Sequence, residues 1–306
     1  MDGDEKTVSN NIDITVFTPT FNRGHLIKKL YDSLRKQHNY CFEWLVIDDG
    51  STDNTEDFFS EIRNHSNNFH IKYIKTENGG KHRAINKAVD IANGKLFFIV
   101  DSDDYLPEYA IERIIQWENE ISNSNVKFAG VSGNRGVTKN EIIGTTFSGE
   151  YVDASSLERE KFKIMGDKAE VFYTKVLRSY KFPEIAGENF ITESVVWFKI
   201  ASDGFKIRWF NEIICITEYL EGGLTQSGLS LYERNMNGLL LSTRQEIRYK
   251  QLSLKWRLGK CLRYVELARK QRNSITRISN DLILSKPIVL MLVILLNVKK
   301  NIKKRS

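Results

Sequence analysis

The sequence has few cysteines and lacks the segments that would direct it out of the cell. Its three cysteines lie far apart with no CxxC spacing, which argues against a disulfide framework or a structural zinc site. The first residues, MDGDEK, are acidic and polar and contain no apolar stretch of the kind found in secretion signals. We therefore expect a cytoplasmic protein.

The composition is that of a soluble globular protein, with 41% hydrophobic and 27% charged residues, and this argues against extensive disorder. The net charge of +6 conceals an asymmetry along the chain. Residues 244–306 carry 17 Lys and Arg against three acidic residues, whereas the preceding part is net acidic. A basic tail on an acidic body indicates a polyanionic partner for the tail.

Strand-like and helix-like patterns alternate through the first hundred residues. Apolar or β-branched runs are each followed by a polar loop and an amphipathic stretch; the predicted strands are 14–18, 42–48, 71–75 and 96–100. This alternation predicts an α/β fold with a mostly parallel central sheet flanked by helices. Further strands are expected in 128–147 and 206–219, with a helix in 191–205 between them.

Polar residues gather where the predicted strands end: TPTFNR, DDGSTD, NGGKH and DSDD follow the first four strands in turn. Ligands of open α/β sheets bind outside the carboxyl ends of the strands. The four loops therefore predict one ligand site.

The loop DSDD places three carboxylates, Asp101, Asp103 and Asp104, at the end of a buried strand. Asp-x-Asp spacing puts two side chains on the same side of an extended segment. Such hard oxygen ligands suit Mg²⁺ or Mn²⁺, with substrate phosphates as further ligands. The alternative is a solvated acidic turn before the following helix.

The motifs ITVFTPTFNR, VIDDGSTDNT, NGG before a helix, and FIVDSDDYL occur in this order. In order and spacing they resemble family 2 glycosyltransferases with the Rossmann-like GT-A fold, over residues 12–219. The resemblance implies a nucleotide-sugar donor, a Mn²⁺ or Mg²⁺ cofactor, and inversion at the anomeric carbon.

The resemblance also implies roles for single residues. Asp49 would accept a hydrogen bond from the base, which favours uracil and hence a UDP-sugar. Asp101 would contact the ribose side, and Asp103 would bind the metal. The donor site would further include Thr18, Pro19, Thr20, Asn22, Arg23, Asn78 and Ser102.

One departure from the family pattern concerns the helix after the third strand, where AIN stands in place of the usual ARN triplet. We assign the charge-balancing role of the missing arginine to Lys81, with Arg83 second. The alternative for both is a solvated basic face.

The general base of an inverting transfer is expected in the stretch GENFITESV. Glu193 fits this role, with Glu188 as its competitor and helix capping as the alternative function of Glu193. Processive relatives carry a QxxRW motif. The corresponding loop here reads TQSGL, which favours the addition of one sugar.

The chain divides into a polar tail (1–11), a GT-A domain (12–225) and a basic helical region (226–306). Within the GT-A domain, residues 12–125 would bind the donor and 126–225 the acceptor. An apolar anchor at 282–298 precedes a polybasic end. Its uninterrupted apolar part would reach about half of a ~30 Å hydrocarbon core, which favours a shallow anchor over a spanning helix.

The basic region predicts association with an anionic membrane surface, which makes the protein peripheral on the inner face of the cell membrane. Nucleic acid is not expected as a partner, because no aromatic residue follows Tyr264 to stack on bases. The predicted function is inverting, metal-dependent transfer of one sugar to a glycan or lipid-linked acceptor in surface polysaccharide synthesis. A metal-dependent nucleotidyltransferase and a non-catalytic membrane adaptor that keeps the fold are the alternatives.

Overall fold

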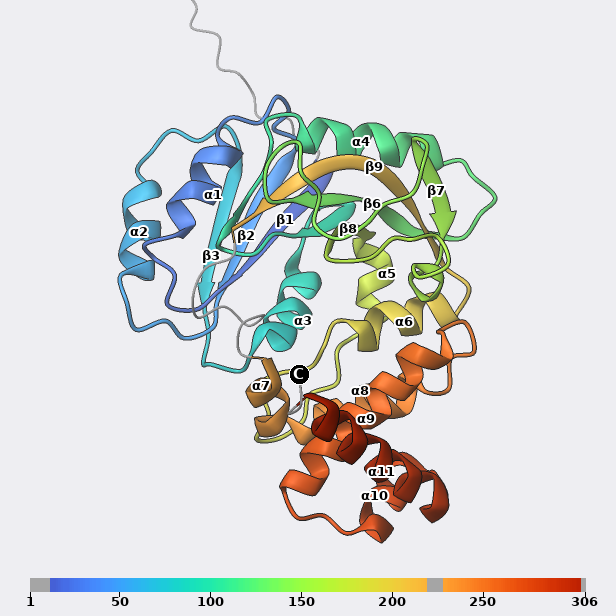
Figure 1. Ribbon diagram of the computed structural model, residues 1–306. Coiled ribbons are helices and arrows are strands. Elements are labelled where there is room, and N and C mark those ends of the chain that lie inside the picture. Colours follow the sequence, from blue (N-terminus) through green and yellow to red (C-terminus); the bar gives the residue numbers. More distant parts are fainter. Residues whose placement is uncertain (1–11, 219–227, 304–306) are drawn as a thin grey trace, which may run out of the picture.

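The computed structural model describes residues 12–218 and 228–303. A single mixed sheet forms the centre, with α4 on one side and α3, α5 and α6 on the other, and a helical C-terminal region packs beside it (Figure 1). The strands are β1 (Ile14–Thr20), β2 (Phe42–Asp48), β3 (His70–Lys75), β4 (Leu96–Ile99), β5 (Asp104–Tyr105), β6 (Phe128–Gly136), β7 (Tyr151–Ala154), β8 (Lys168–Tyr173) and β9 (Lys206–Thr217). The helices are α1 (Ile27–Leu34), α2 (Thr55–Ile62), α3 (Lys81–Ile91), α4 (Ala110–Ile121), α5 (Thr174–Arg178), α6 (Ser194–Ser202), α7 (Gly228–Arg234), α8 (Met236–Glu246), α9 (Leu254–Lys270), α10 (Ile275–Leu282) and α11 (Lys286–Lys303), and a 3₁₀ turn covers Ser156–Glu158.

The strand order is β3-β2-β1-β4-β8-β6-β9-β5, and β7 pairs with β9. The first four strands in this order are parallel, as their βαβ spacing predicts. Strand β8 then pairs antiparallel with both β4 and β6, so the complete sheet is mixed. The predicted α/β fold is confirmed.

The inner parallel strands β1, β2 and β4 are buried because helices cover both faces of the sheet. All seven residues of β2 are buried, and its sequence FEWLVID is an almost continuous apolar run. The edge strand β3 has no buried residue. Parallel register aligns Thr20 of β1 with Asp48 of β2, which brings the loops after these strands to the same edge.

The second half of the sheet differs from expectation. The strand expected in 128–147 ends at Gly136, after which one isolated bridge joins Gly136 to Ile142. The helix expected in 191–205 and the strand expected in 206–219 are present as α6 and β9.

Three apolar clusters form in the described chain. The largest lies around the sheet, and the smaller core joins α8, α9, α10 and α11 through residues such as Leu239, Val265 and Leu292. A third, minor cluster includes Phe198 and Leu252. The predicted boundary between residues 225 and 226 falls in 219–227, outside the described residues, and so does the predicted tail 1–11.

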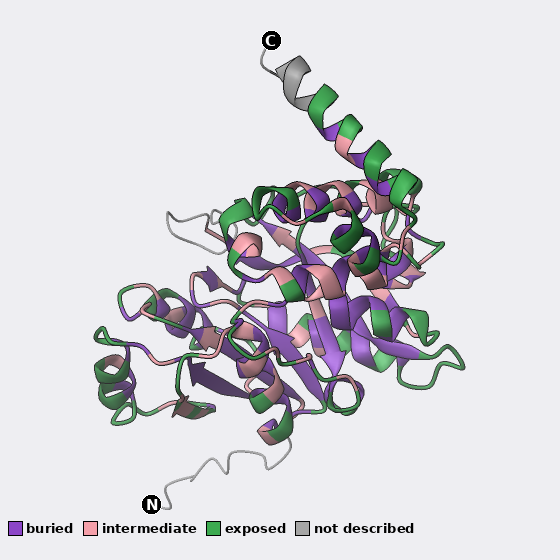
Figure 2. Ribbon diagram, turned by 90° about the horizontal axis from the view of Figure 1, so that it is seen from below, coloured by how far each residue is buried: buried purple, intermediate pink, exposed green. Residues whose placement is uncertain are grey.

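No single helix of the described chain is long and apolar enough to cross a membrane. Helices α10 and α11 together meet this criterion, but they are bent by 110° at the break between them. Figure 2 shows α11 leading away from the body of the protein, with buried and exposed residues alternating along it.

Candidate functional site

The loop after β1 is fixed by the loop after β2. Asn22 has a φ of 54°, a left-handed conformation that asparagine tolerates better than most residues. Its backbone N–H donates to Ser51 Oγ (2.8 Å), and its side-chain oxygen accepts from the Thr52 N–H (2.8 Å). Gly24 N–H donates to the Asp53 carboxylate (3.0 Å). The motifs TPTFNR and DDGSTD therefore form one structural unit.

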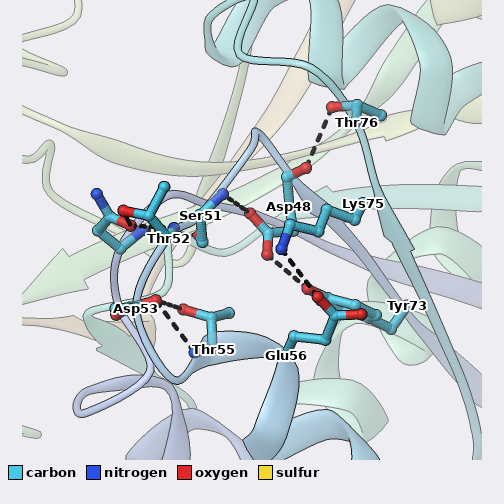
Figure 3. Close-up of polar contacts among 10 residues, drawn as sticks. Asp48, Ser51, Thr52, Asp53, Thr55, Glu56, Tyr73, Lys75 and Thr76 are labelled. Carbon is cyan, nitrogen blue, oxygen red and sulfur yellow. Dashed lines mark hydrogen bonds and ion pairs between the residues drawn. The ribbon is translucent and has the colours of Figure 1, made fainter.

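The buried residue Asp48 forms hydrogen bonds at the start of the loop after β2 (Figure 3). Its carboxylate accepts from the Ser51 N–H (2.8 Å) and from the hydroxyl of Tyr73, and its carbonyl accepts from the Thr76 N–H (2.8 Å). Burial and the hydrogen bond to Asp48 raise the pKa of Tyr73. Asp48 thus ties the loop after β2 to strand β3.

Asp49, predicted to contact the base, binds the NGG loop. Its two carboxylate oxygens accept from Gly79 N–H (2.7 Å) and Gly80 N–H (2.8 Å), and the Asn78 side chain donates to its carbonyl (2.9 Å). Burial raises the pKa of Asp49 even though the two backbone donors oppose the shift. Asp49 therefore fixes the start of α3, a role that its sequence position did not suggest.

Lys81 joins three segments that are distant in sequence. Its ammonium lies 2.7 Å from Asp101 Oδ1, at the end of β4, and 3.0 Å from Glu193 Oε1, just before α6. Burial lowers the pKa of Lys81, but the charges of Asp101 and Glu193 outweigh it and the pKa is raised. Burial likewise raises the pKa of Asp101, but Lys81 and Arg135 outweigh it and hold that pKa below its usual value.

Asp104, the third carboxylate of the cluster, has a structural partner. Its carboxylate forms a buried ion pair with Arg135 of β6. Its backbone, in β5, pairs antiparallel with that of Thr217 in β9. Arg135 also donates to the carbonyls of Ile99 (3.3 Å) and Lys168 (3.1 Å). Burial raises the pKa of Asp104 to about 6. The pair anchors the DSDD turn to the second half of the sheet, and sequence reasoning missed Arg135.

Asp103 remains as the metal-binding candidate. It is partly buried, and among the described residues its carboxylate forms no ion pair. Burial and the neighbouring charge of Asp101 raise its pKa. In the described chain no three His, Cys, Asp or Glu side chains converge to hold an ion. Mg²⁺ is commonly held by one or two carboxylates together with substrate phosphates, so the residues present fit a metal delivered with its phosphates.

The two candidates for the general base differ in their surroundings. Glu188 is 8% exposed, and its carboxylate accepts from the backbone N–H groups of Asn237 and Gly238, both at 2.7 Å. It caps the N-terminus of α8. The Glu193 side chain is 40% exposed and makes no capping bond to α6; it reaches Lys81 instead. Of the two, only Glu193 lies beside the carboxylate cluster.

Arg83, the second candidate for charge balance, connects α3 to a loop of the second half. Its guanidinium donates to the carbonyls of Glu188 (2.8 Å) and Ile185 (2.9 Å) and lies 3.4 Å from the Glu184 carboxylate. Lys81, by contrast, contacts the carboxylates of the site.

Other predicted residues lie at the same edge with different environments. Thr18 is fully buried, and its hydroxyl accepts from Trp44 Nε1 (3.0 Å). The hydroxyl of Thr20 is buried without a hydrogen-bond partner among the described residues. Ser102 is buried in the DSDD turn, whereas Pro19 of β1 and Arg23 in the loop after β1 are partly exposed.

His82, the residue after Lys81, is 2% exposed, and neither ring nitrogen has a partner in the described chain. Burial and the nearby Arg83 lower its pKa to about 4. The imidazole is therefore neutral at physiological pH.

The segments that form this site also match a known protein family. The sequence profile described as Glycosyl transferase family 2 matches residues 15–174, more than half of the chain and all of the carboxylate site except Glu193. The chain belongs to this family.

Curated relatives of this family 2 chain include two bacterial enzymes. It is 28% identical over 193 residues to a Campylobacter jejuni GalNAc(5)-diNAcBac-PP-undecaprenol beta-1,3-glucosyltransferase, covering 61% of this chain and 59% of the relative. It is 26% identical over 208 residues to the putative teichuronic acid biosynthesis glycosyltransferase TuaG of Bacillus subtilis, covering 67% and 78%. The chain thus spans less than two thirds of the length of the Campylobacter relative.

Solved structures confirm the GT-A fold. Staphylococcus aureus TarS 1–349 in complex with UDP-GlcNAc has a TM-score of 0.61 at 20% identity, covering 85% of this chain and 72% of TarS 1–349. The mannosyltransferase PcManGT of Pyrobaculum calidifontis, in complex with GDP-Man and Mn²⁺, has a TM-score of 0.55 at 19% identity, covering 86% and 76%. At these identities the likeness concerns the fold.

Proposed function

We propose that this protein is an inverting, metal-dependent glycosyltransferase that moves one sugar from a UDP-sugar to a glycan or lipid-linked acceptor in bacterial surface polysaccharide synthesis. The observation that carries the proposal is the convergence of Lys81, Asp101 and Glu193 beside Asp103 at the carboxyl ends of the strands. The activities of two relatives support the acceptor class: one is a glucosyltransferase named for an undecaprenol-linked glycan, and the other is a putative teichuronic acid biosynthesis glycosyltransferase.

The residues divide the reaction between them. Asp103 would hold Mn²⁺ or Mg²⁺, which when bound supplies positive charge for the leaving diphosphate. Lys81 adds a protein cation at the same place. Glu193 accepts the proton of the acceptor hydroxyl as that oxygen attacks the anomeric carbon, and attack opposite the leaving group inverts the configuration.

The donor proposal favours uridine because a carboxylate at position 49 can accept from a ring N–H. Both Asp49 oxygens already accept backbone bonds in this structure, but a carboxylate oxygen has a second lone pair. The structure of S. aureus TarS 1–349 is a complex with UDP-GlcNAc, which agrees with this donor class.

The test is to incubate the protein with a panel of UDP-sugars, Mn²⁺ and undecaprenyl-diphosphate-linked acceptors, and to identify both products. UDP release with a longer glycan supports the proposal, and Glu193→Gln should reduce the rate by at least ~100-fold. Release of pyrophosphate when UTP and a sugar 1-phosphate replace the UDP-sugar would establish the nucleotidyltransferase alternative instead. A cellular role unaffected by both Asp103→Ala and Glu193→Gln would establish the adaptor.

The C-terminal region supplies a surface for a peripheral location on the inner face of the cell membrane. Val289, Leu292 and Leu296 of α11 are buried in the smaller core. Its other face exposes apolar side chains, namely Ile288, Leu290, Met291, Ile294, Leu295 and Val298. The surrounding sequence, residues 244–306, is strongly basic. Apolar and basic groups together fit an anionic bilayer surface.

Vesicle co-sedimentation tests this location. We expect binding to vesicles that contain phosphatidylglycerol, weaker binding to phosphatidylcholine alone, and release by high salt. The double substitution Met291→Asp and Ile294→Asp should abolish binding, whereas Val137→Asp, at an exposed apolar residue after β6, should not. Equal sedimentation of all variants would contradict the assignment of α11.

A further inference from the structure

The contact between Lys81 and Glu193 connects the binding of the donor to the availability of the general base. This inference rests on the function proposed above. The same ammonium group contacts Asp101, on the donor side, at 2.7 Å and Glu193, the general base, at 3.0 Å. One cation therefore serves two carboxylates with different roles.

The three side chains come from elements that are distant in sequence. Lys81 is the first residue of α3, Asp101 follows β4, and Glu193 precedes α6. The backbone before Lys81 is fixed, because the two carboxylate oxygens of Asp49 accept hydrogen bonds from the N–H groups of Gly79 and Gly80. A flexible side chain on a fixed helix start can change partners without moving the backbone.

We propose that Glu193 and the donor diphosphate compete for Lys81, so that binding of the donor releases the general base from its ion pair. An oxygen paired with an ammonium group is a poor proton acceptor. A diphosphate held beside Asp103 brings additional negative charge within reach of the same ammonium. Donor binding thus frees Glu193 to accept the proton of the acceptor hydroxyl.

This exchange predicts a measurable competition between Glu193 and the donor for one cation. Removing the Glu193 charge frees Lys81 and should tighten the binding of UDP with Mn²⁺, even though Glu193 is assigned to the acceptor side. Loss of a partly exposed ion pair corresponds to a change in affinity of up to roughly fivefold. Simple repulsion between Glu193 and the diphosphate would produce a gain that does not require Lys81.

A double-mutant cycle separates the two explanations. Calorimetric titration of UDP with Mn²⁺ at pH 7.5 is carried out on the wild type, Glu193→Gln, Lys81→Met and the double variant. We expect Glu193→Gln to bind UDP more tightly in the Lys81 background and to have no effect in the Lys81→Met background. Lys81→Arg, which keeps the charge, should restore the dependence on Glu193.

Asp90→Asn is the matched control, since Asp90 pairs with Lys181 and lies on the same helix α3, away from the site. It should leave UDP affinity unchanged. The inference is overturned if Glu193→Gln fails to tighten binding, or if its gain persists in Lys81→Met. Absence of UDP binding in the wild type would instead refute the proposed donor, so the two failures are distinguishable.

Discussion

The buried pair between Asp104 and Arg135 yields a quantitative prediction about the turn that carries the metal-binding candidate. Asp104 is 2% exposed, and the Arg135 side chain is 11% exposed. Arg135→Met removes the cation and leaves an unpaired buried carboxylate. Breaking such a pair from one side costs about 3–5 kcal/mol. Two carbonyl oxygens, on Ile99 and Lys168, lose a donor as well.

The cost should depend on pH in a defined direction. Burial raises the pKa of Asp104 to about 6, so between about pH 4 and pH 6 the native state binds more protons than the unfolded state. Stability from this group therefore decreases as the pH rises through that window. Without Arg135 the pKa rises further, because the cation that opposed burial is gone. The penalty of Arg135→Met should thus be smaller at pH 5 than at pH 8.

Urea unfolding at both pH values measures the effect. Asp104→Asn in the Arg135→Met background removes the buried charge and should recover most of the lost free energy of unfolding. Lys199→Met breaks an exposed pair with Asp203 and should cost no more than ~0.5 kcal/mol. A penalty below ~1 kcal/mol for Arg135→Met, or one unaffected by Asp104→Asn, would refute the reasoning.

Three further perturbations follow from single contacts. The low pKa of His82, about 4, means that the unfolded state takes up a proton first, so stability falls as the pH drops from ~6.5 to ~4. His82→Gln should reduce this slope in urea unfolding, and an unchanged slope would contradict the role of His82. Glu188→Gln weakens the cap of α8 and should lower the free energy of unfolding in urea by ~1–2 kcal/mol. An unchanged urea midpoint would contradict the capping role of Glu188. Gly80→Ala should abolish UDP binding or folding, because Gly80 has a φ of 92° and an added Cβ would lie 1.8 Å from Asn189 O; normal UDP affinity in a folded variant would contradict this geometry.

The sequence predicted the parallel half of the fold because its signals are local. Three of the first four strands are apolar or β-branched runs, and β3 alternates apolar and basic residues. Each ends in a polar loop, and the four loops meet at one edge as expected. Strands β7 and β8 were missed. YVDA is too short to show periodicity, and KAEVFY is placed by its antiparallel pairing with β4 and β6, which no local pattern reveals.

The site shows the same division between local and distant information. Asp101 and Asp103 were recognisable from their place after a buried strand. The roles of Arg135 and Glu188 depend on partners 31 and 49 residues away, in elements whose packing the sequence does not display. The one available signal for Arg135 was a charged residue within the strand-like segment FAGVSGNRG. The capping interpretation of Glu193 was an alternative that the geometry does not favour, since its carboxylate contacts Lys81.

Calorimetric titration of UDP into the purified protein, with and without Mn²⁺, tests the proposed donor and the proposed metal site together. GDP is the nucleotide control, and Asp153→Ala, which removes a carboxylate paired with Arg208 elsewhere in the sheet, is the control for Asp103→Ala. The account predicts UDP binding that requires Mn²⁺, persists in Asp153→Ala and is lost in Asp103→Ala. UDP binding that is indifferent to both Mn²⁺ and Asp103, or no UDP binding under any condition, would contradict it.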